Sequence, residues 1–259
     1  MTTHSRTVVV TGAANGIGRA TALKFAMQDH AVFGADLQYS DENRALLEAA
    51  GITCLMADVR DVTSVESVIQ KAIQATSRLD VLVNNAGLGM VKQIDDVSEA
   101  DWDMVIDTNL KAAFFGCKAA ITVMSQQASG GSIINVASNA GLLPRSHDPV
   151  YSISKMALVG LTKSLALCHS KDRIRINCVC PGPVENTQMI EENFVGRTDR
   201  QQVVRELIQA SPLARAWDRM ISPDEVADAI LYLASEGARM VSGTAIAIDG
   251  GKSLGVPPG

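Results

Sequence analysis

The most constraining feature of this sequence is a regular alternation between short, β-branched apolar runs and longer segments with helical spacing. Because the short runs are too apolar to leave either face in water, they need helices over both sides of one parallel sheet with right-handed crossovers. The sequence therefore predicts a doubly wound α/β fold with a seven-stranded parallel sheet and helices on both faces. The predicted strands are Thr7–Val10, Ala31–Ala35, Ile52–Ala57, Val81–Val83, Ser132–Val136, Ile174–Cys180 and Thr244–Ile248.

Helical spacing marks the segments between these strands. The predicted helices are Gly18–Met27, Val62–Thr76, Trp102–Met124, Val150–Leu167 and Pro223–Ala234. Ser222 is placed to cap the last of them, with Pro223 at its first position. No linker-like composition divides the 259 residues, so we expect a single domain spanning 1–259.

The interval 181–221 breaks this rhythm, with a helical pattern only around Gln201–Gln209. A long excursion inside a compact domain is typical of a lid, and plain surface packing is the alternative. We expect a substrate lid at about 185–220. The apolar residues available to close over a ligand are Met189, Ile190, Phe194 and Trp217.

Charge and cysteine content narrow the classes of function. With 23 basic and 28 acidic side chains, the net charge is −5, which favours neither nucleic acid nor anionic lipid. The uncharged stretch 119–144 is rich in Ser, Gln and Asn, and is too polar for a membrane span. The five cysteines show no CxxC spacing, which is typical of reduced thiols. We expect a cytoplasmic protein with no bound metal and no nucleic-acid or membrane partner.

A glycine-rich turn follows the first predicted strand and opens a helix, in the run Thr11-Gly12-Ala13-Ala14-Asn15-Gly16-Ile17-Gly18. In a strand–turn–helix unit, the free amide hydrogens at the helix start and the helix dipole favour a pyrophosphate. A tight turn without ligand is the alternative for a glycine triplet alone. The strand–turn–helix context favours a dinucleotide and a Rossmann-like fold.

Asp36 ends the second predicted strand, 18 residues after Gly18. A carboxylate there can accept hydrogen bonds from both hydroxyls of an adenosine ribose, and it repels a 2′-phosphate. Neither Asn15 nor Leu37 offers a positive charge to such a phosphate. The expected cofactor is therefore NAD. A solvent-facing carboxylate is the alternative reading of Asp36.

Three residues form the candidate chemical centre: Ser138, Tyr151 and Lys155. Tyr151 and Lys155 are four apart in a helical segment and so share a helix face. A lysine about 5 Å from a tyrosine favours the phenolate by roughly 3 kcal/mol at an effective dielectric constant of 20, most of what a base near neutral pH needs. Ser138 follows a predicted strand at the carboxyl edge of the sheet, where ligands bind in such folds.

Together these motifs resemble the short-chain dehydrogenase/reductase family, in its single-domain branch of about 250 residues, over almost the whole chain. The residues that carry the resemblance are the Thr11–Gly18 turn, Asp36, Asp58-Val59, Asn84-Asn85-Ala86-Gly87, Asn109, Ser138, Tyr151, Lys155 and Pro181-Gly182.

The resemblance implies hydride transfer between a nicotinamide cofactor and a secondary alcohol or ketone. It implies Tyr151 as general acid/base, Ser138 as the group that polarises the substrate oxygen, and Asn109 as the holder of a relay water. Lys155 would bind the nicotinamide ribose and lower the pKa of Tyr151. A homotetramer is also implied. The implied cofactor-binding residues are Gly12, Asn15, Gly16, Ile17, Gly18, Asp36, Leu37, Asp58, Val59, Asn85, Ala86, Gly87, Tyr151, Lys155, Pro181, Gly182, Val184 and Thr187.

The chain departs from the family pattern after Pro181. The family places a threonine five residues after this proline to contact the nicotinamide carboxamide, whereas here Thr187 comes one residue later. Either a local bulge restores Thr187 or Asn186 makes the contact, and Val184 is the more secure of the nearby positions.

The substrate is not specified by these motifs. The residues expected to line its pocket are Leu142, Leu143, Arg145, His147 and Asp148, together with the apolar lid residues. The leading hypothesis is an NAD-dependent alcohol dehydrogenase or carbonyl reductase. The alternatives are a reductase resembling 3-oxoacyl-carrier-protein reductase, and a non-catalytic nucleotide-sensing protein, because a fold does not fix a function.

Overall fold

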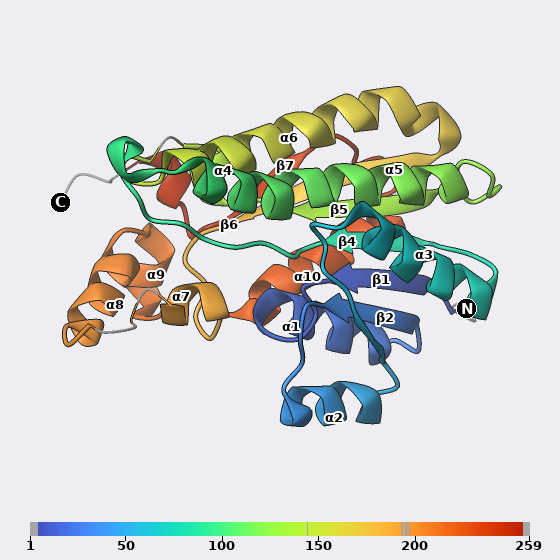
Figure 1. Cartoon of the computed structure of the whole chain (residues 1–259), viewed down its shortest axis with the longest axis horizontal. Coiled ribbons are helices and arrows are strands. Elements are labelled where there is room, and N and C mark those ends of the chain that lie inside the picture. The colour runs from blue at the N-terminus through green and yellow to red at the C-terminus, as the bar shows by residue number, and fades with distance from the viewer. Residues whose placement is uncertain (1–4, 144, 193, 195–196, 256–259) are drawn as a thin grey trace.

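The computed structural model describes residues 5–143, 145–192, 194 and 197–255. Its centre is one parallel sheet with strand order β3-β2-β1-β4-β5-β6-β7, confirming the predicted fold class (Figure 1). The strands are β1 (Thr7–Thr11), β2 (Ala31–Asp36), β3 (Thr53–Met56), β4 (Val81–Asn84), β5 (Gly131–Val136), β6 (Ile174–Pro181) and β7 (Ala245–Ile248). The order reverses between β1 and β4, so a crevice opens there at the carboxyl ends of the strands.

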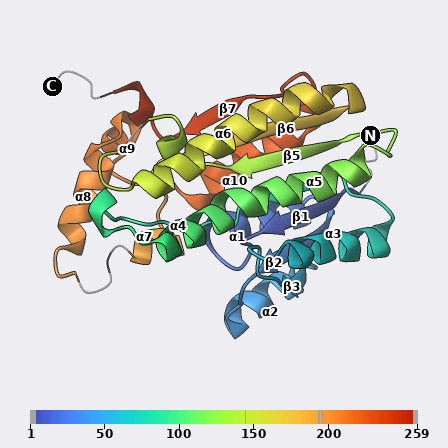
Figure 2. The same cartoon turned by 45° about the horizontal axis from the view of Figure 1, so that its top comes forward.

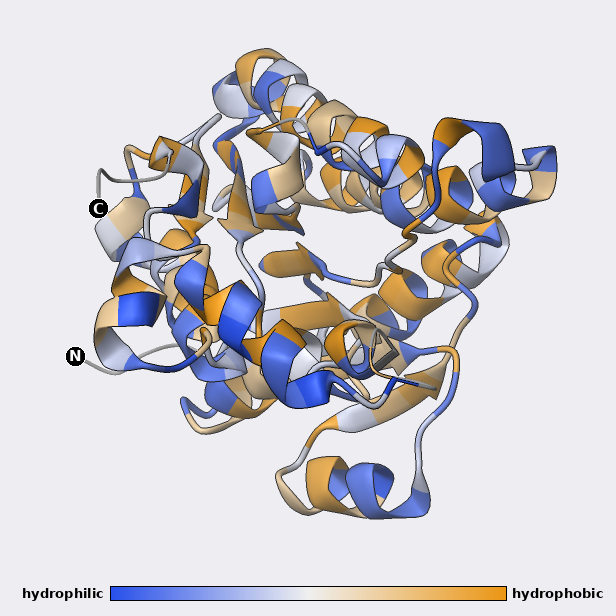
Figure 3. Ribbon diagram, turned by 90° about the vertical axis from the view of Figure 1, so that its left-hand side faces the viewer, coloured by the Kyte–Doolittle hydropathy of each residue, from blue (hydrophilic) through white to orange (hydrophobic). Residues whose placement is uncertain are grey.

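Helices cover both faces of the sheet (Figure 2). One face packs against α1 (Gly16–Ala26) and α10 (Pro223–Ala234), with α2 (Asp41–Ala49) near the β3 edge. The other face packs against α3 (Val62–Thr76), α5 (Ala112–Met124) and α6 (Pro149–His169), with α4 (Glu99–Ile106) beside α6. Figure 3 shows apolar strands at the centre and hydrophilic residues on the outer helix surfaces.

The predicted helix Trp102–Met124 is not continuous. A π-helical turn, Asp107–Lys111, separates α4 from α5 and contains Asn109. A π-helix carries one extra residue per turn, which apolar periodicity does not reveal, and such turns are frequent at functional sites.

Two edge strands are less buried than predicted. In β3 no residue is fully buried, and in β7 one residue is exposed and the others are partly buried. Each edge strand pairs on one side only, so the apolar composition of its run reflects partial rather than complete cover.

Helix α2 was not predicted, because only Leu47 of its residues is buried and the rest of the segment is largely polar. Ser40 caps it by accepting a hydrogen bond from the Asn43 amide. The prediction for α10 is confirmed in full: Ser222 caps the helix and Glu225 completes a reciprocal capping box.

The interval expected to form a lid contains three short helices: α7 (Gln188–Glu192), α8 (Arg200–Gln209) and α9 (Pro212–Trp217). Residues 193, 195 and 196 of this interval lie outside the described residues. The three helices gather at one end of the molecule, on the left of Figure 1, away from the start of β1.

A chain of buried amide and hydroxyl groups ties β4, β5 and α6 together. Asn84 Nδ2 donates to Asn135 Oδ1 at 2.9 Å, and Asn135 Nδ2 donates to Thr162 Oγ1 at 2.9 Å. Thr162 in turn donates to the Leu158 carbonyl at 2.8 Å. Because buried amides need partners, this chain fixes α6 on the strands that lead into the crevice.

Candidate active site

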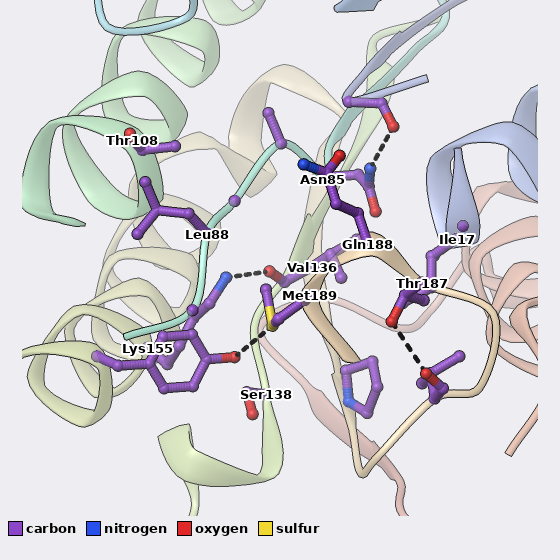
Figure 4. A pocket seen from close by; sticks show the side chains of 18 of the residues that line it. Ile17, Asn85, Leu88, Thr108, Val136, Ser138, Lys155, Thr187, Gln188 and Met189 are labelled. Carbon is purple, nitrogen blue, oxygen red and sulfur yellow. Dashed lines mark hydrogen bonds between the residues drawn. The ribbon is translucent and has the colours of Figure 1, made fainter. Parts of the chain in front are cut away.

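A cavity of about 540 Å³ opens at the carboxyl ends of the strands. Every residue predicted for catalysis or cofactor binding lines it except Gly18 and Asn109. The fold therefore brings together side chains that are more than a hundred residues apart in sequence. Figure 4 shows this cavity, with Ser138 and Lys155 on one side and Ile17 and Thr187 on the other.

The glycine-rich turn is shaped by backbone rather than by side chains. Gly12 and Gly16 have φ of 67° and 52°, a region that favours glycine. A side chain at Gly18 would overlap the Gly12 carbonyl oxygen, so the turn passes directly beneath the first turn of α1. The Asn85 side chain stabilises the turn, because its Nδ2 donates to the carbonyls of Thr11 and Gly12 at 2.9 and 3.0 Å.

Asp36 lies at the cavity wall with its carboxylate already oriented. One oxygen accepts from the Ala14 amide at 2.8 Å and the other accepts from the Leu37 amide at 2.7 Å. Burial raises the pKa of this carboxyl, and the backbone hydrogen bonds oppose the rise. The side chain thus joins the glycine turn to the end of β2 and keeps an acid at the cavity wall.

One cation lines the same end of the cavity, Arg60, and it is paired. Its guanidinium contacts Asp58 Oδ2 at 2.6 Å, and this contact holds the pKa of Asp58 below its usual value. Asp58 and Val59 line the cavity where they were predicted to.

Ser138, Tyr151 and Lys155 are all buried and all line the cavity. Ser138 follows β5, and Tyr151 and Lys155 lie one turn apart on α6. The Lys155 ammonium donates to the Val136 carbonyl at 3.0 Å and lies 5.8 Å from the centre of the Tyr151 ring. The geometry of the predicted centre is therefore present.

Burial moves the pKa of both ionisable members of this centre. It lowers the pKa of Lys155 from 10.5 to about 8. It raises the pKa of Tyr151 above 10.0, and the nearby Ser138 hydroxyl and Arg145 guanidinium offset only part of the rise. The expected lowering of the tyrosine pKa by Lys155 is therefore not found in the protein alone, because desolvation outweighs the favourable charges.

Asn109 lies next to the cavity rather than on its wall. Its side chain accepts from the Leu88 amide at 2.9 Å, and donates to the Leu88 carbonyl at 3.0 Å and to Ser154 Oγ at 3.1 Å. The Asn109 amide therefore fixes the loop after β4 against α6.

Gly87 separates Asn109 from Lys155. A side-chain carbon at Gly87 would lie 3.1 Å from Asn109 Oδ1 and 3.3 Å from Lys155 Nζ. Because Gly87 has no side chain, a narrow space remains between the Asn109 side-chain oxygen and the Lys155 ammonium.

The segment after Pro181 brings Thr187 into the cavity in spite of its extra residue. Asn186 adopts a left-handed conformation with φ of 55°, and both Val184 and Thr187 line the cavity whereas Asn186 does not. Thr187 Oγ1 donates to the Val184 carbonyl at 3.0 Å. Of the two readings of this departure, the local distortion is the one that the geometry favours.

Met189 reaches over the chemical centre from α7. Its sulfur lies 3.9 Å from the Tyr151 hydroxyl. Figure 4 draws this contact as a dashed line that starts at Met189. A side chain at Gly89 would lie 3.0 Å from the same methionine. The first part of the predicted lid therefore contacts both the centre and the loop after β4.

Predictions for the substrate side were partly wrong. Arg145, Asp148, Met189 and Ile190 line the cavity, but Leu142, Leu143, His147, Phe194 and Trp217 do not. Trp217 is 60% exposed and stacks with the Arg219 guanidinium 4.9 Å away. It ends α9, and the left-handed Asp218 that follows turns the chain there.

Further cavity residues were not predicted, including Leu88, Met90, Met104, Thr108, Leu207 and Lys252. Leu88 and Met90 follow directly after the Asn-Ala-Gly motif at the end of β4, so their position beside a strand end could have indicated them. Lys252 carries no such local signal.

The described residues contain neither a cluster of metal ligands nor a membrane-spanning helix. There, no three His, Cys, Asp or Glu side chains are grouped as metal ligands would be. None of the helices described is both long and apolar enough to cross a bilayer.

Comparisons with known proteins agree with the geometry. The family model for enoyl-(acyl carrier protein) reductase matches residues 12–253. The 3-oxoacyl-[acyl-carrier-protein] reductase of Thermotoga maritima is 34% identical, covering 97% of this chain and 99% of that protein. Dehydrogenase/reductase SDR family member 6 of Rattus norvegicus is 37% identical, covering 97% and 98%.

Among solved structures, levodione reductase superposes with a TM-score of 0.89 at 28% identity, covering 96% of this chain and 98% of that one. The match thus extends over the sheet, the helices and the cavity alike. The chain belongs to the short-chain dehydrogenase/reductase family of oxidoreductases.

Proposed function

We propose that this protein is an NAD-dependent oxidoreductase that transfers a hydride between nicotinamide and a secondary alcohol or ketone. The observation that carries the proposal is the single cavity shared by the glycine turn, Asp36 and the Ser138, Tyr151 and Lys155 side chains. A cofactor laid along this cavity would run from the β2 end of the sheet to the chemical centre on α6.

The residues present fit such a cofactor. Gly12 and Gly16 line the cavity in conformations that favour glycine, and Gly18 lets the start of α1 approach the Gly12 carbonyl, as a pyrophosphate-binding turn at a helix start requires. Asp36 would accept from the adenosine ribose, while Val184 and Thr187 would contact the nicotinamide. Lys155 would donate to the nicotinamide ribose.

The preference for NAD over NADP rests on charge. Asp36 would repel a 2′-phosphate, and Arg60 at that end of the cavity is already paired with Asp58. Equal or better use of NADP would contradict this assignment.

In the proposed reaction, Tyr151 accepts the hydroxyl proton of the alcohol as its carbinol hydrogen leaves with the bonding electrons. NAD⁺, when bound, would supply the acceptor for that hydride and a positive charge. Ser138 holds the substrate oxygen, and Lys155 adds a positive charge below its pKa of about 8. Because the Asn109 side chain is used by Leu88 and Ser154, we assign its part in a water relay to its backbone.

A lid role for 185–220 follows from Met189. It contacts the Tyr151 hydroxyl, so substrate entry requires this side chain to move. We also propose a cytoplasmic location, which the free cysteines among the described residues support. A homotetramer is proposed by family resemblance, and sedimentation of the purified protein tests it.

The test of function follows NADH absorbance while secondary alcohols and ketones are offered with NAD⁺ or NADH. Tyr151→Phe should lower kcat at least a hundredfold, since general acid/base catalysis contributes about 10²–10⁴-fold. Tyr232→Phe, an exposed tyrosine on α10, is the matched control and should behave as wild type. A Tyr151→Phe protein that keeps most activity would refute the mechanism.

Reduction of a 3-oxoacyl thioester is the second candidate, favoured by the Thermotoga maritima relative named for that activity. It predicts faster turnover of acetoacetyl thioesters with NADPH than of any alcohol with NAD⁺. If NAD binds but no alcohol or carbonyl compound is turned over, a nucleotide-sensing role replaces both candidates.

A further inference from the structure

Two basic side chains lie on the substrate side of the cavity, and the mechanism above uses neither of them. Arg145 comes from the segment between β5 and α6, and Lys252 comes from the short helical turn Lys252–Leu254 after β7. They are far apart in sequence, yet the fold brings both to the wall of the same cavity.

Lys252 is partly buried, and its ammonium makes no hydrogen bond or ion pair with any residue that the structure describes. The carboxylate whose charge acts on Lys252, Asp249, already accepts hydrogen bonds from the backbone. One of its oxygens accepts from the Gly251 amide at 2.9 Å and the other accepts from the Ser253 amide at 2.8 Å. Burial lowers the pKa of Lys252, and Arg145 lowers it further. An ammonium in this position gains from an anion that the protein itself does not provide.

Arg145 lines the cavity and has donors that no described residue uses. Its Nε contacts the buried Asp148 at 3.1 Å, and the other oxygen of Asp148 accepts from Ser152 Oγ at 3.0 Å. The two terminal nitrogens of the guanidinium make no hydrogen bond within the described part of the chain. The guanidinium carbon lies 5.8 Å from the centre of the Tyr151 ring.

We propose that Arg145 and Lys252 form a carboxylate subsite, so that the substrate is a short hydroxy acid or the corresponding oxo acid. A carboxylate suits a guanidinium with two free nitrogens and a nearby ammonium, since charge-assisted hydrogen bonds to both satisfy its oxygens. The inference rests on the proposed function, because it assigns the substrate class of the same centre.

The position of these cations favours a carboxylate on the substrate over a phosphate on a carrier arm. Arg145 lies against the ring of the residue that exchanges the proton, so its anion and the reacting carbon belong to one small molecule. A phosphate at the far end of a carrier arm would lie outside this distance. Oxidation removes hydride from the carbinol carbon to NAD⁺ and its hydroxyl proton to Tyr151, and leaves the carboxylate unchanged.

The experiment compares 2-hydroxybutanoate and 3-hydroxybutanoate with their methyl esters, which keep the carbinol and lack the charge. We expect kcat/KM to be at least about tenfold higher for one of the acids than for its ester. Arg145→Gln and Lys252→Gln should each lower this acid-to-ester ratio about tenfold, mainly through a higher KM for the acid. Lys71→Gln, an exposed lysine on α3, is the matched control and should leave the ratio unchanged.

A binding measurement separates this inference from the proposed function. Butanoate and butanamide are titrated calorimetrically into protein saturated with NADH. Preferential binding of butanoate that is lost in Arg145→Gln and Lys252→Gln supports the subsite even if no turnover is seen. Turnover of acids and esters at equal kcat/KM, or equal binding of butanoate and butanamide, overturns the subsite and leaves the hydride-transfer proposal intact. Faster turnover of acetoacetyl-coenzyme A than of either acid would assign the cations to a carrier phosphate and also overturn it.

Discussion

The buried ammonium of Lys155 should make the protein more stable as the pH rises, in the same direction as an acid-labile carboxylate but in an alkaline range of pH. Its pKa is about 8 in the folded protein, against 10.5 for an unburied lysine. Between these two values the unfolded chain binds more protons than the folded one, so the free energy of unfolding rises as the pH rises.

The size of the effect follows from the two pKa values. Going from pH 7 to pH 9, deprotonation of Lys155 alone adds about 1.3 kcal/mol to the free energy of unfolding. The gain reaches about 2.5 kcal/mol by pH 10. Buried thiols act in the opposite direction, since burial raises the pKa of Cys117 to about 12. Only a comparison with a variant that lacks the lysine isolates its contribution.

The assay is urea denaturation of wild type and Lys155→Met without cofactor at pH 7 and pH 9, at one protein concentration. From pH 7 to pH 9, the free energy of unfolding of wild type should rise by about 1.3 kcal/mol more than that of Lys155→Met, because the two proteins share every other titrating group. Lys163→Met, an exposed lysine on the same helix, should show no such difference from wild type. If the difference in free energy of unfolding between wild type and Lys155→Met were the same at pH 7 and pH 9, the pKa of Lys155 would be that of an ordinary lysine, and the reasoning would be refuted.

Further predictions concern the glycines and the buried amide chain. Gly18→Ala should abolish NAD binding measured by calorimetry, because its new carbon would overlap a backbone oxygen of the turn. Gly160→Ala, at an open position on α6, should instead raise the free energy of unfolding by about 0.5–1 kcal/mol with unchanged binding. Asn135→Ala should lower that free energy by about 2–4 kcal/mol in urea denaturation, because it strands the buried polar groups of Asn84 and Thr162. A loss below 0.5 kcal/mol would show that these groups find other partners.

The fold could be predicted from sequence wherever burial is complete. Central strands such as β4 and β5 are buried along nearly their whole length, so their apolar runs were unmistakable. Helix α2 was not predicted because only Leu47 of its residues is buried in the core. A helix with one buried apolar residue shows little apolar periodicity in its sequence. The π-helical turn was not predicted because a single inserted residue changes the backbone hydrogen bonding of a helix without changing the composition of the segment.

The site was predictable where chemistry ties residue types to fixed spacing. The glycines of the first turn and the Tyr151–Lys155 pair depend on local geometry, and both lie where expected. Lys252 and Trp217 show the limit of this reasoning. Lys252 reaches the cavity only because the chain turns back after β7, whereas Trp217 is apolar and near in sequence but faces outward. Such placements are set by tertiary packing, which no local pattern encodes.

Burial is the main cause of both pKa shifts at the centre, the rise for Tyr151 and the fall for Lys155. These shifts bear on the direction of the proposed reaction, because that direction depends on whether Tyr151 is protonated. Burial alone disfavours both the tyrosinate and the lysine ammonium, so the protein by itself holds Tyr151 protonated. A protonated phenol is the acid that carbonyl reduction needs, and the reduced cofactor is the form with an uncharged ring. Alcohol oxidation needs the phenolate, and the oxidised cofactor carries the positive ring that would stabilise it. Because Tyr151 is buried, the charge of a cofactor bound as proposed would be screened less than it would be in water. In the proposed mechanism, the desolvation that opposes the phenolate in the protein alone would therefore let the oxidation state of the cofactor select the proton state of Tyr151.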